Sequence, residues 1–126
     1  MTDTTWLLIP ADIDRDVSIL HEGKDADDIT LKQLQTAVGG LIEYARHDLR
    51  WAEIIVNEEG LMMGLLPNVR AVVASCIQQM LVGDAVLQVP KAHAPAHLRA
   101  MHEITAFVRS KLQQICLLYT SDAADE

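Results

Sequence analysis

Cysteines, aromatic residues and long apolar runs are all scarce in this sequence. With 2 cysteines in 126 residues, no framework of disulfide bonds underlies the fold. Hydrophobic runs stay far below the roughly 20 residues that a membrane-spanning helix needs. The first of them, Trp6 to Ile9, is flanked by acids and lacks the basic leader of a secretory signal. These absences predict a soluble cytoplasmic protein without a membrane segment.

Positive charge is scarce as well. The 10 lysines and arginines face 18 acidic residues, which leaves a formal net charge of -8. Direct binding to nucleic acid needs a basic face, and this balance argues against one. The composition is otherwise globular, with 50% hydrophobic and 22% charged residues. A chain of 126 residues has room for one hydrophobic core, so we expect one domain.

Five short apolar runs have the length and composition of β-strands. The first is closed by Pro10 and is typical of a largely buried strand. In the second, apolar and polar residues alternate as they do in an edge strand. The predicted strands cover residues 5–11, 17–21, 41–45, 51–56 and 81–89. Together with about three helices, they predict a single α+β domain with a largely antiparallel sheet.

Two helices are predicted between these strands. Thr30 is followed three residues later by Gln33, which makes a capping box, and Gly39 supplies the left-handed residue that ends a helix. Asn68 is a natural N-cap for the second helix. Its apolar stripe consists of Val69, Val72, Val73, Cys76, Ile77 and Met80. Because Cys76 lies on this stripe, we expect its thiol to be buried in the core.

A third helix begins near Pro95, whose missing N–H costs nothing in a first helical turn. Its apolar stripe consists of Leu98, Met101, Thr105, Val108, Leu112 and Ile115. We divide the chain into a core at residues 1–90, an additional helix at residues 91–115 and a tail at residues 116–126. The tail breaks the helical spacing and resembles the translated read-through of a sequencing adapter. We therefore expect it to be dispensable and the natural C-terminus to be missing.

No motif of a catalytic site is present. The glycine pair at Gly39 lacks the Lys-Ser/Thr of a phosphate-binding loop, and no Gly-x-Ser-x-Gly elbow occurs. Asp12, Asp14 and Asp16 take the first three oxygen positions of a calcium loop. The glycine and the bidentate glutamate that the rest of this motif requires are missing. We therefore expect a solvated acidic loop and no calcium.

Three histidines, His93, His97 and His102, lie at the start of the last helix. The first two have the four-residue spacing that places two imidazoles on one helical face, but Pro95 stands between them. Only Glu103 is near enough in sequence to add a further ligand. We therefore expect surface histidines, and neither a bound metal nor a cofactor.

Polar residues gather at two places within the apolar middle of the chain. A turn and a helix cap account for Asn57 and Asn68 without any ligand. Glu58, Glu59 and Arg70 are not needed for that local geometry. These five residues form our candidate binding surface, and no residue is assigned a catalytic role.

Five short motifs follow one another at characteristic distances. They are LLIPAD (7–12), LKQLQTAVGGLIE (31–43), VNEEG (56–60), LPNVRA (66–71) and VGDAV (82–86). Over residues 6–89 this order resembles the family called domain of unknown function 3846, small proteins of phages, plasmids and their bacterial hosts. The long acidic stretch at residues 12–28 and the helix after Pro90 depart from its pattern. The resemblance implies a small accessory protein of a mobile element and carries over no catalytic residue.

These observations predict a non-enzymatic phage or plasmid accessory protein that binds a host protein or a small ligand in the host cytoplasm. A DNA mimic is the alternative, in which carboxylates replace phosphates against a basic host protein. A small-molecule enzyme is the third reading. The apolar stripe on residues 96–115 must pack either on its own sheet or on a second copy, as a homodimer.

Overall fold

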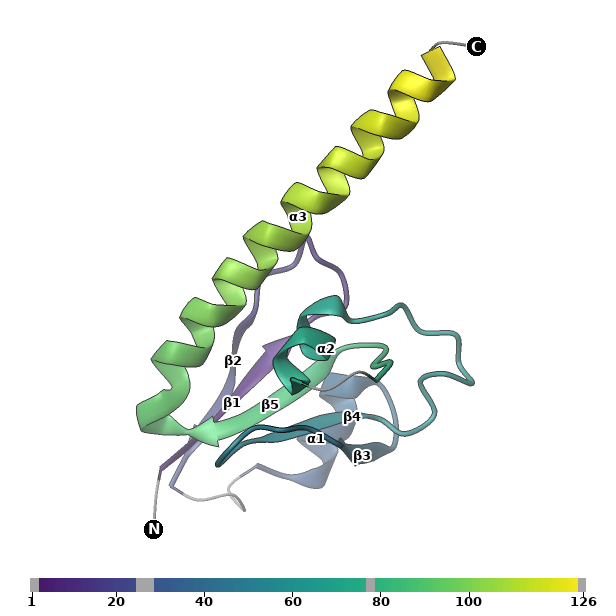
Figure 1. Ribbon diagram of the computed structural model, residues 1–126. Coiled ribbons are helices and arrows are strands. Elements are labelled where there is room, and N and C mark those ends of the chain that lie inside the picture. Colours follow the sequence, from purple (N-terminus) through teal and green to yellow (C-terminus); the bar gives the residue numbers. More distant parts are fainter. Residues whose placement is uncertain (1–2, 25–28, 77–78, 125–126) are drawn as a thin grey trace.

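The computed structural model describes residues 3–24, 29–76 and 79–124, and its core is one antiparallel sheet (Figure 1). Its five strands lie in the order β2-β1-β5-β4-β3. They are β1 (Thr4–Ile9), β2 (Ser18–Gly23), β3 (Ile42–Ala45), β4 (Glu53–Asn57) and β5 (Ala85–Pro90). The helices are α1 (Leu31–Val38), α2 (Val69–Ser75) and α3 (Ala94–Ala124), with a short 3-10 turn, η1 (Lys91–His93), before α3. The prediction of one α+β domain with an antiparallel sheet and three helices is confirmed.

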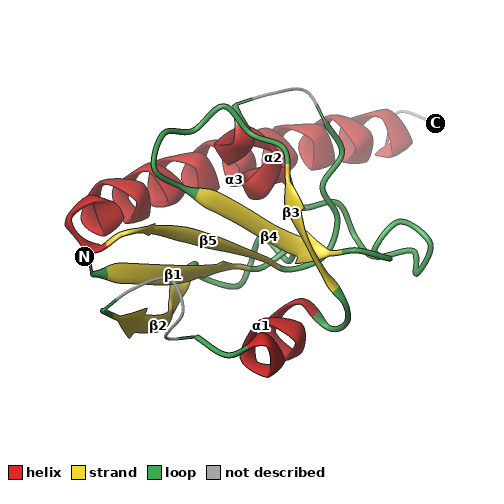
Figure 2. Cartoon of the chain, turned by 90° about the horizontal axis from the view of Figure 1, so that it is seen from below, coloured by secondary structure: helices red, strands yellow, loops and turns green. Residues whose placement is uncertain are grey.

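Helices cover both faces of the sheet, with α1 on one side and α2 and α3 on the other (Figure 2). Successive strand residues point to opposite faces. Trp6 therefore packs with α1, whereas Leu7 packs with α2 and α3. In β5, Val86 and Leu87 divide in the same way. Both faces are apolar, which explains why the central strands are nearly continuous hydrophobic runs.

The capping box predicted for α1 is confirmed. The Thr30 hydroxyl accepts a hydrogen bond from the Gln33 amide at 3.1 Å, and the Gln33 side chain accepts one from the Thr30 amide at 2.8 Å. Gly39 ends the helix with a φ of 81°, which a residue with a side chain adopts only under strain. Start and stop of α1 are thus encoded locally.

We predict that Thr30→Ala lowers the free energy of unfolding by about 0.5–2 kcal/mol, because the Gln33 amide at the start of α1 loses the hydroxyl that accepts its hydrogen bond. Urea titration measures this loss. Thr36→Ala is the matched control, since Thr36 is exposed within the same helix. It should be neutral or slightly stabilising. Equal effects of the two substitutions would show that the box adds nothing to stability.

The structure corrects the prediction for α2. This helix ends at Ser75, and Cys76 follows with a φ of 61°. Val69 and Val73, two members of the predicted stripe, are exposed. The Cys76 thiol, predicted to be buried, is exposed as well. Ile77, another member of that stripe, lies outside the described residues.

The buried face of α2 instead carries Arg70, Ala71, Ala74 and Ser75. Ala71 and Ala74 belong to the core between the sheet and the helices α2 and α3. The prediction chose the face of Val69 and Val73 because it considered only the apolar residues of the helix. It did not allow for burial of the charged Arg70 on another face.

The helix α3 packs on its own sheet only along its first half. Met101 and Thr105 are buried, and Leu98 packs against the same core. Leu112 and Ile115, further along the predicted stripe, are exposed. The helical backbone continues to Ala124, past the predicted end of the helix. Among the described residues, no helix is long and apolar enough to span a membrane.

Candidate functional site

Arg70, one of the five candidate residues, is almost completely buried, with 1% of its surface exposed. Its Nη2 atom donates to the carbonyl oxygens of Pro10, Asp12 and Arg15 at 2.7, 2.9 and 2.8 Å. Its Nη1 atom donates to the Thr105 hydroxyl at 3.2 Å. One guanidinium thus ties the loop after β1 to α2 and to the middle of α3.

No carboxylate forms an ion pair with Arg70 among the residues that the structure describes. Burial lowers the pKa of Arg70 below its ordinary value of 12.5, and the nearby charge of Arg109 lowers this pKa further. The negative charges of Asp16, Asp12 and Asp84 act in the opposite direction. Arginine stays charged at physiological pH even so. The buried guanidinium of Arg70 is therefore stabilised mainly by the dipoles of the backbone carbonyls that accept its hydrogen bonds.

The acidic loop at residues 12–16 is organised around this cation. The Asp12 carboxylate accepts a hydrogen bond from the Asp14 amide at 2.9 Å, while the backbone oxygen of Asp12 faces Arg70. Arg15 lies 3.6 Å from the Asp84 carboxylate, and Arg109 donates to the backbone oxygen of Ile13. The loop that resembled half a calcium motif thus surrounds a guanidinium instead.

Asn68 is fully buried and uses its side chain at both ends. Its Oδ1 atom accepts from the Ala71 amide at 3.0 Å, which is the predicted N-cap of α2. Its Nδ2 atom donates to the carbonyl oxygens of Ile9 at 2.8 Å and Gly83 at 2.9 Å. The residue therefore joins the start of α2 to the end of β1 and to the loop before β5.

Asn57 is buried at the end of β4. Its Oδ1 atom accepts from the Glu59 amide at 2.8 Å, and its Nδ2 atom donates to the Val38 carbonyl at 3.2 Å. A Cβ atom at Gly40 would lie only 2.9 Å from this Nδ2 atom, so a larger residue there would force the Asn57 side chain to shift. Asn57 thus fixes the turn after β4 to the end of α1.

Glu58 and Glu59, the remaining two candidates, are exposed beside three exposed apolar side chains. Leu61 is 70% exposed, Met62 86% and Met63 54%. We call these five residues, Glu58, Glu59, Leu61, Met62 and Met63, the loop surface. A small hollow of about 60 Å³ adjoins it, and its lining includes Glu43, Glu58, Leu61 and the exposed Met80.

The turn that carries the loop surface is held by its own backbone. The Met63 amide donates to the Glu59 carbonyl at 2.9 Å, and the Leu65 amide donates to the Gly60 carbonyl at 3.1 Å. A Cβ atom at Gly60 would lie 2.8 Å from a methyl group of Val82, so the turn sits tightly on the loop before β5. Its apolar tip is therefore presented to solvent by an ordered support.

A second concave surface lies between α2, α3 and the acidic loop. It encloses about 500 Å³. We call it the helix groove, and its lining residues are Ala11, Asp12, Ile13, Leu66, Pro67, Val69, Arg70, Val108 and Leu112. Apolar side chains dominate this lining, and its one buried charge, Arg70, is engaged with backbone carbonyls.

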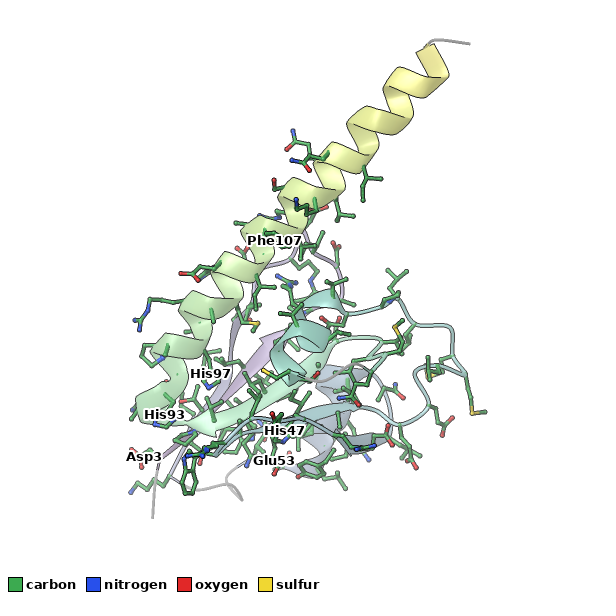
Figure 3. All side chains as sticks on the ribbon, viewed as in Figure 1. Asp3, His47, Glu53, His93, His97 and Phe107 are labelled. Carbon is green, nitrogen blue, oxygen red and sulfur yellow. The ribbon has the colours of Figure 1, made fainter. Side chains whose placement is uncertain are left out.

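The three late histidines lie on η1 and α3, and Figure 3 labels the first two, His93 and His97. His93 and His102 are exposed, whereas His97 is half-buried. In the described part of the chain, no three His, Cys, Asp or Glu side chains come close enough together to hold a metal ion.

We predict that His97 makes stability fall in mild acid. Burial lowers the pKa of His97 below its ordinary value of 6.5, and the neighbouring His93 adds to this effect. The unfolded chain then binds more protons than the folded chain, so the stabilising contribution is complete above pH 6.5 and is lost below it. His97→Gln should flatten this decline in urea titrations at a series of pH values. His102→Gln, on the exposed side of the same helix, is the control, and an identical flattening by both would contradict the assignment.

Sequence reasoning missed the central role of Arg70 and the exposure of the loop tip. The carbonyl partners of Arg70 lie 55 to 60 residues earlier in the chain, so no local sequence pattern predicts these contacts. Leu61, Met62 and Met63 did carry a signal, since three large apolar residues between two glycines of a turn have little chance of burial.

Comparison with protein families matched the chain to the domain of unknown function DUF3846 over residues 15–109. Comparison with curated proteins and with solved structures found no match. The matched region covers about three quarters of the chain. It contains four of the five strands, α1, α2 and the first half of α3. Compared with the resemblance drawn over residues 6–89, the match begins after the first motif at residues 7–12 and continues further, to residue 109. The chain therefore belongs to the DUF3846 family.

Proposed function

We propose that this protein is a non-enzymatic binding module that acts on a host protein through the loop surface. A phage or plasmid setting, implied by the resemblance described above, is part of this proposal. The observation that carries it is the exposure of Leu61, Met62 and Met63 on an ordered turn. An exposed apolar patch lowers the solubility of a protein unless a partner covers it, and such patches are typical of interaction sites.

The hydrogen bonds of the other polar candidates also favour the loop surface as the binding site. The side chains of Asn57, Asn68 and Arg70 donate hydrogen bonds to backbone carbonyls of the fold, and Arg70 also donates to the Thr105 hydroxyl. They are therefore engaged in holding the loops, whereas Glu58 and Glu59 remain exposed. Of the five predicted surface residues, only Glu58 and Glu59 therefore remain available to a partner. The apolar tip of Leu61, Met62 and Met63 lies beside them and completes the proposed surface.

The chemistry of the loop surface defines the partner. Methionine side chains are flexible and polarizable, so Met62 and Met63 adapt to an apolar pocket that does not match them rigidly. Glu58 and Glu59 lie at the base of the tip and favour basic residues around such a pocket. We therefore propose a protein partner with an apolar pocket and a basic rim.

Capture from a bacterial host lysate on the immobilised protein tests this function. Met62→Ser removes the most exposed side chain of the tip, and Leu31→Ser, the control, removes an apolar side chain of α1 that is 59% exposed. We expect specific host proteins to bind the wild type and Leu31→Ser, and to be lost with Met62→Ser. Retention of the same proteins by all three forms would contradict the proposed surface.

The salt dependence of capture separates this function from DNA mimicry. Asp12, Asp14 and Asp16 are exposed and give the mimic its best surface, although Arg15 and Arg109 partly neutralise that region. An apolar contact survives high salt, whereas a surface that imitates phosphates loses its partner steeply. We expect capture to persist at high salt, and its complete loss there would favour mimicry.

A further inference from the structure

The helix α3 is longer than the strands that it covers. Even up to Ile115, before the tail, it spans roughly 33 Å, whereas a strand of 6 residues spans only about 20 Å. Figure 1 shows the outer half of α3 leaving the body of the molecule. Met101 and Thr105 pack on the core, but Leu112 and Ile115 on the same helical stripe are 46% and 53% exposed. The apolar stripe thus continues beyond its own core.

The helix groove opens where α3 leaves the domain. Val108 and Leu112 form one of its walls, and Val69 and Leu66 come from the opposite side. Both Leu66 and Val69 are exposed, so the groove continues the uncovered stripe of α3 as one apolar surface. The surface consists of a concave part and a protruding helix side by side.

We propose that a second copy of this chain covers this surface, so that the protein forms a symmetric dimer. A two-fold axis placed near Leu112 would lay the outer half of each α3 in the helix groove of the other copy. Such an interface is isologous, so one rotation covers both grooves and both exposed stripes together.

Charge complementarity favours the second copy as the occupant. The outer half of α3 carries Arg109 and Lys111, and the groove is bordered by the acidic loop with Asp12, Asp14 and Asp16. Arg109 lies 3.9 Å from Asp14 of its own chain, whose carboxylate nevertheless stays 85% exposed. Lys111 lies over the Phe107 ring, 5.4 Å from its centroid, and is exposed to solvent on the same outer half of the helix. In the dimer, the cationic flank of one helix therefore meets the acidic border of the other.

The dimer goes beyond the proposed function and is independent of it. The seam runs through residues 108–115, which is shorter than the predicted residues 96–115 because the first half of α3 packs on its own sheet. The loop surface belongs to a different part of the chain, the turn after β4. Each dimer would present two such surfaces, which strengthens binding to a partner with repeated sites.

Sedimentation equilibrium of the full chain tests the proposal. At micromolar concentration we expect twice the chain mass of 13.9 kDa. Leu112→Glu should weaken the dimer at least about a hundredfold, because a symmetric interface receives the substitution twice. Leu31→Glu is the matched control, since it places the same charge on an exposed leucine of α1, and it should remain dimeric.

Ile115→Glu repeats the test one turn further from the core, so that a loss of folding cannot imitate a loss of dimer. Monomeric Leu112→Glu and Ile115→Glu beside a dimeric wild type and Leu31→Glu would support the seam. A wild type that stays monomeric, or variants that all stay dimeric, would overturn it. Neither result bears on capture by the loop surface, which is measured separately with Met62→Ser.

Discussion

Arg70→Met is expected to lower the free energy of unfolding by about 3 kcal/mol or more, because it removes a buried donor that serves three carbonyl oxygens. Methionine keeps most of the side-chain volume, so the loss reports on hydrogen bonds and charge more than on packing. Burial of the carbonyls of Pro10, Asp12 and Arg15 without a partner would force the loop to open toward water. Urea titration gives the change in stability.

Arg109→Met is the matched control for this prediction. Arg109 contacts the same loop, through the Ile13 carbonyl at 2.9 Å, but its side chain is 46% exposed. We expect a cost below about 1 kcal/mol, since exposed ion pairs and hydrogen bonds contribute little. If both substitutions cost the same small amount, the guanidinium of Arg70 does not hold the loop.

Asn68→Ala should lower the free energy of unfolding by about 3 kcal/mol, the second-largest effect that we expect. The substitution removes the N-cap of α2, worth about 0.5–2 kcal/mol. It also leaves the carbonyl oxygens of Ile9 and Gly83 without their donor inside the fold. The sum exceeds the effect of Thr30→Ala, where a cap alone is lost.

Asn68→Asp separates the two contributions, again by urea titration. An aspartate still accepts from the Ala71 amide and caps α2, but its carboxylate faces the Ile9 and Gly83 carbonyls in place of the amide donor. We therefore expect Asn68→Asp to be about as destabilising as Asn68→Ala. Near-normal stability of Asn68→Asp would mean that only the cap matters.

Local signals predicted much of the fold because they act within a few residues. The capping box at Thr30 and the left-handed Gly39 bound α1 as expected. Strand β2 is an edge strand, as its alternating pattern indicated. The start of β4 was placed two residues early, because Trp51 has a φ of 62° and stands out of the sheet. Predictions were thus most accurate where backbone geometry follows from neighbouring side chains.

The buried face of α2 was not predictable in this way. The apolar spacing of Val69 and Val73 favoured the wrong face, because the stabilisation of α2 comes from Arg70 and its distant carbonyl partners. The hydrogen bonds from Arg70 to these carbonyls also explain why Arg70 is not part of an exposed binding surface, because they bury its side chain within the fold. Only tertiary structure brings the loop after β1 to this helix.

Hydrogen–deuterium exchange with a captured and purified host partner tests the central claim most directly, because it shows which surface the partner covers. We predict that the partner slows exchange at residues 58–64, the turn that carries Glu58, Glu59 and the exposed tip. Exchange at the start of α1 should stay unchanged and serves as the internal reference. Unaltered exchange at residues 58–64, with protection confined to the acidic loop at residues 12–16, would contradict the account and favour a DNA mimic.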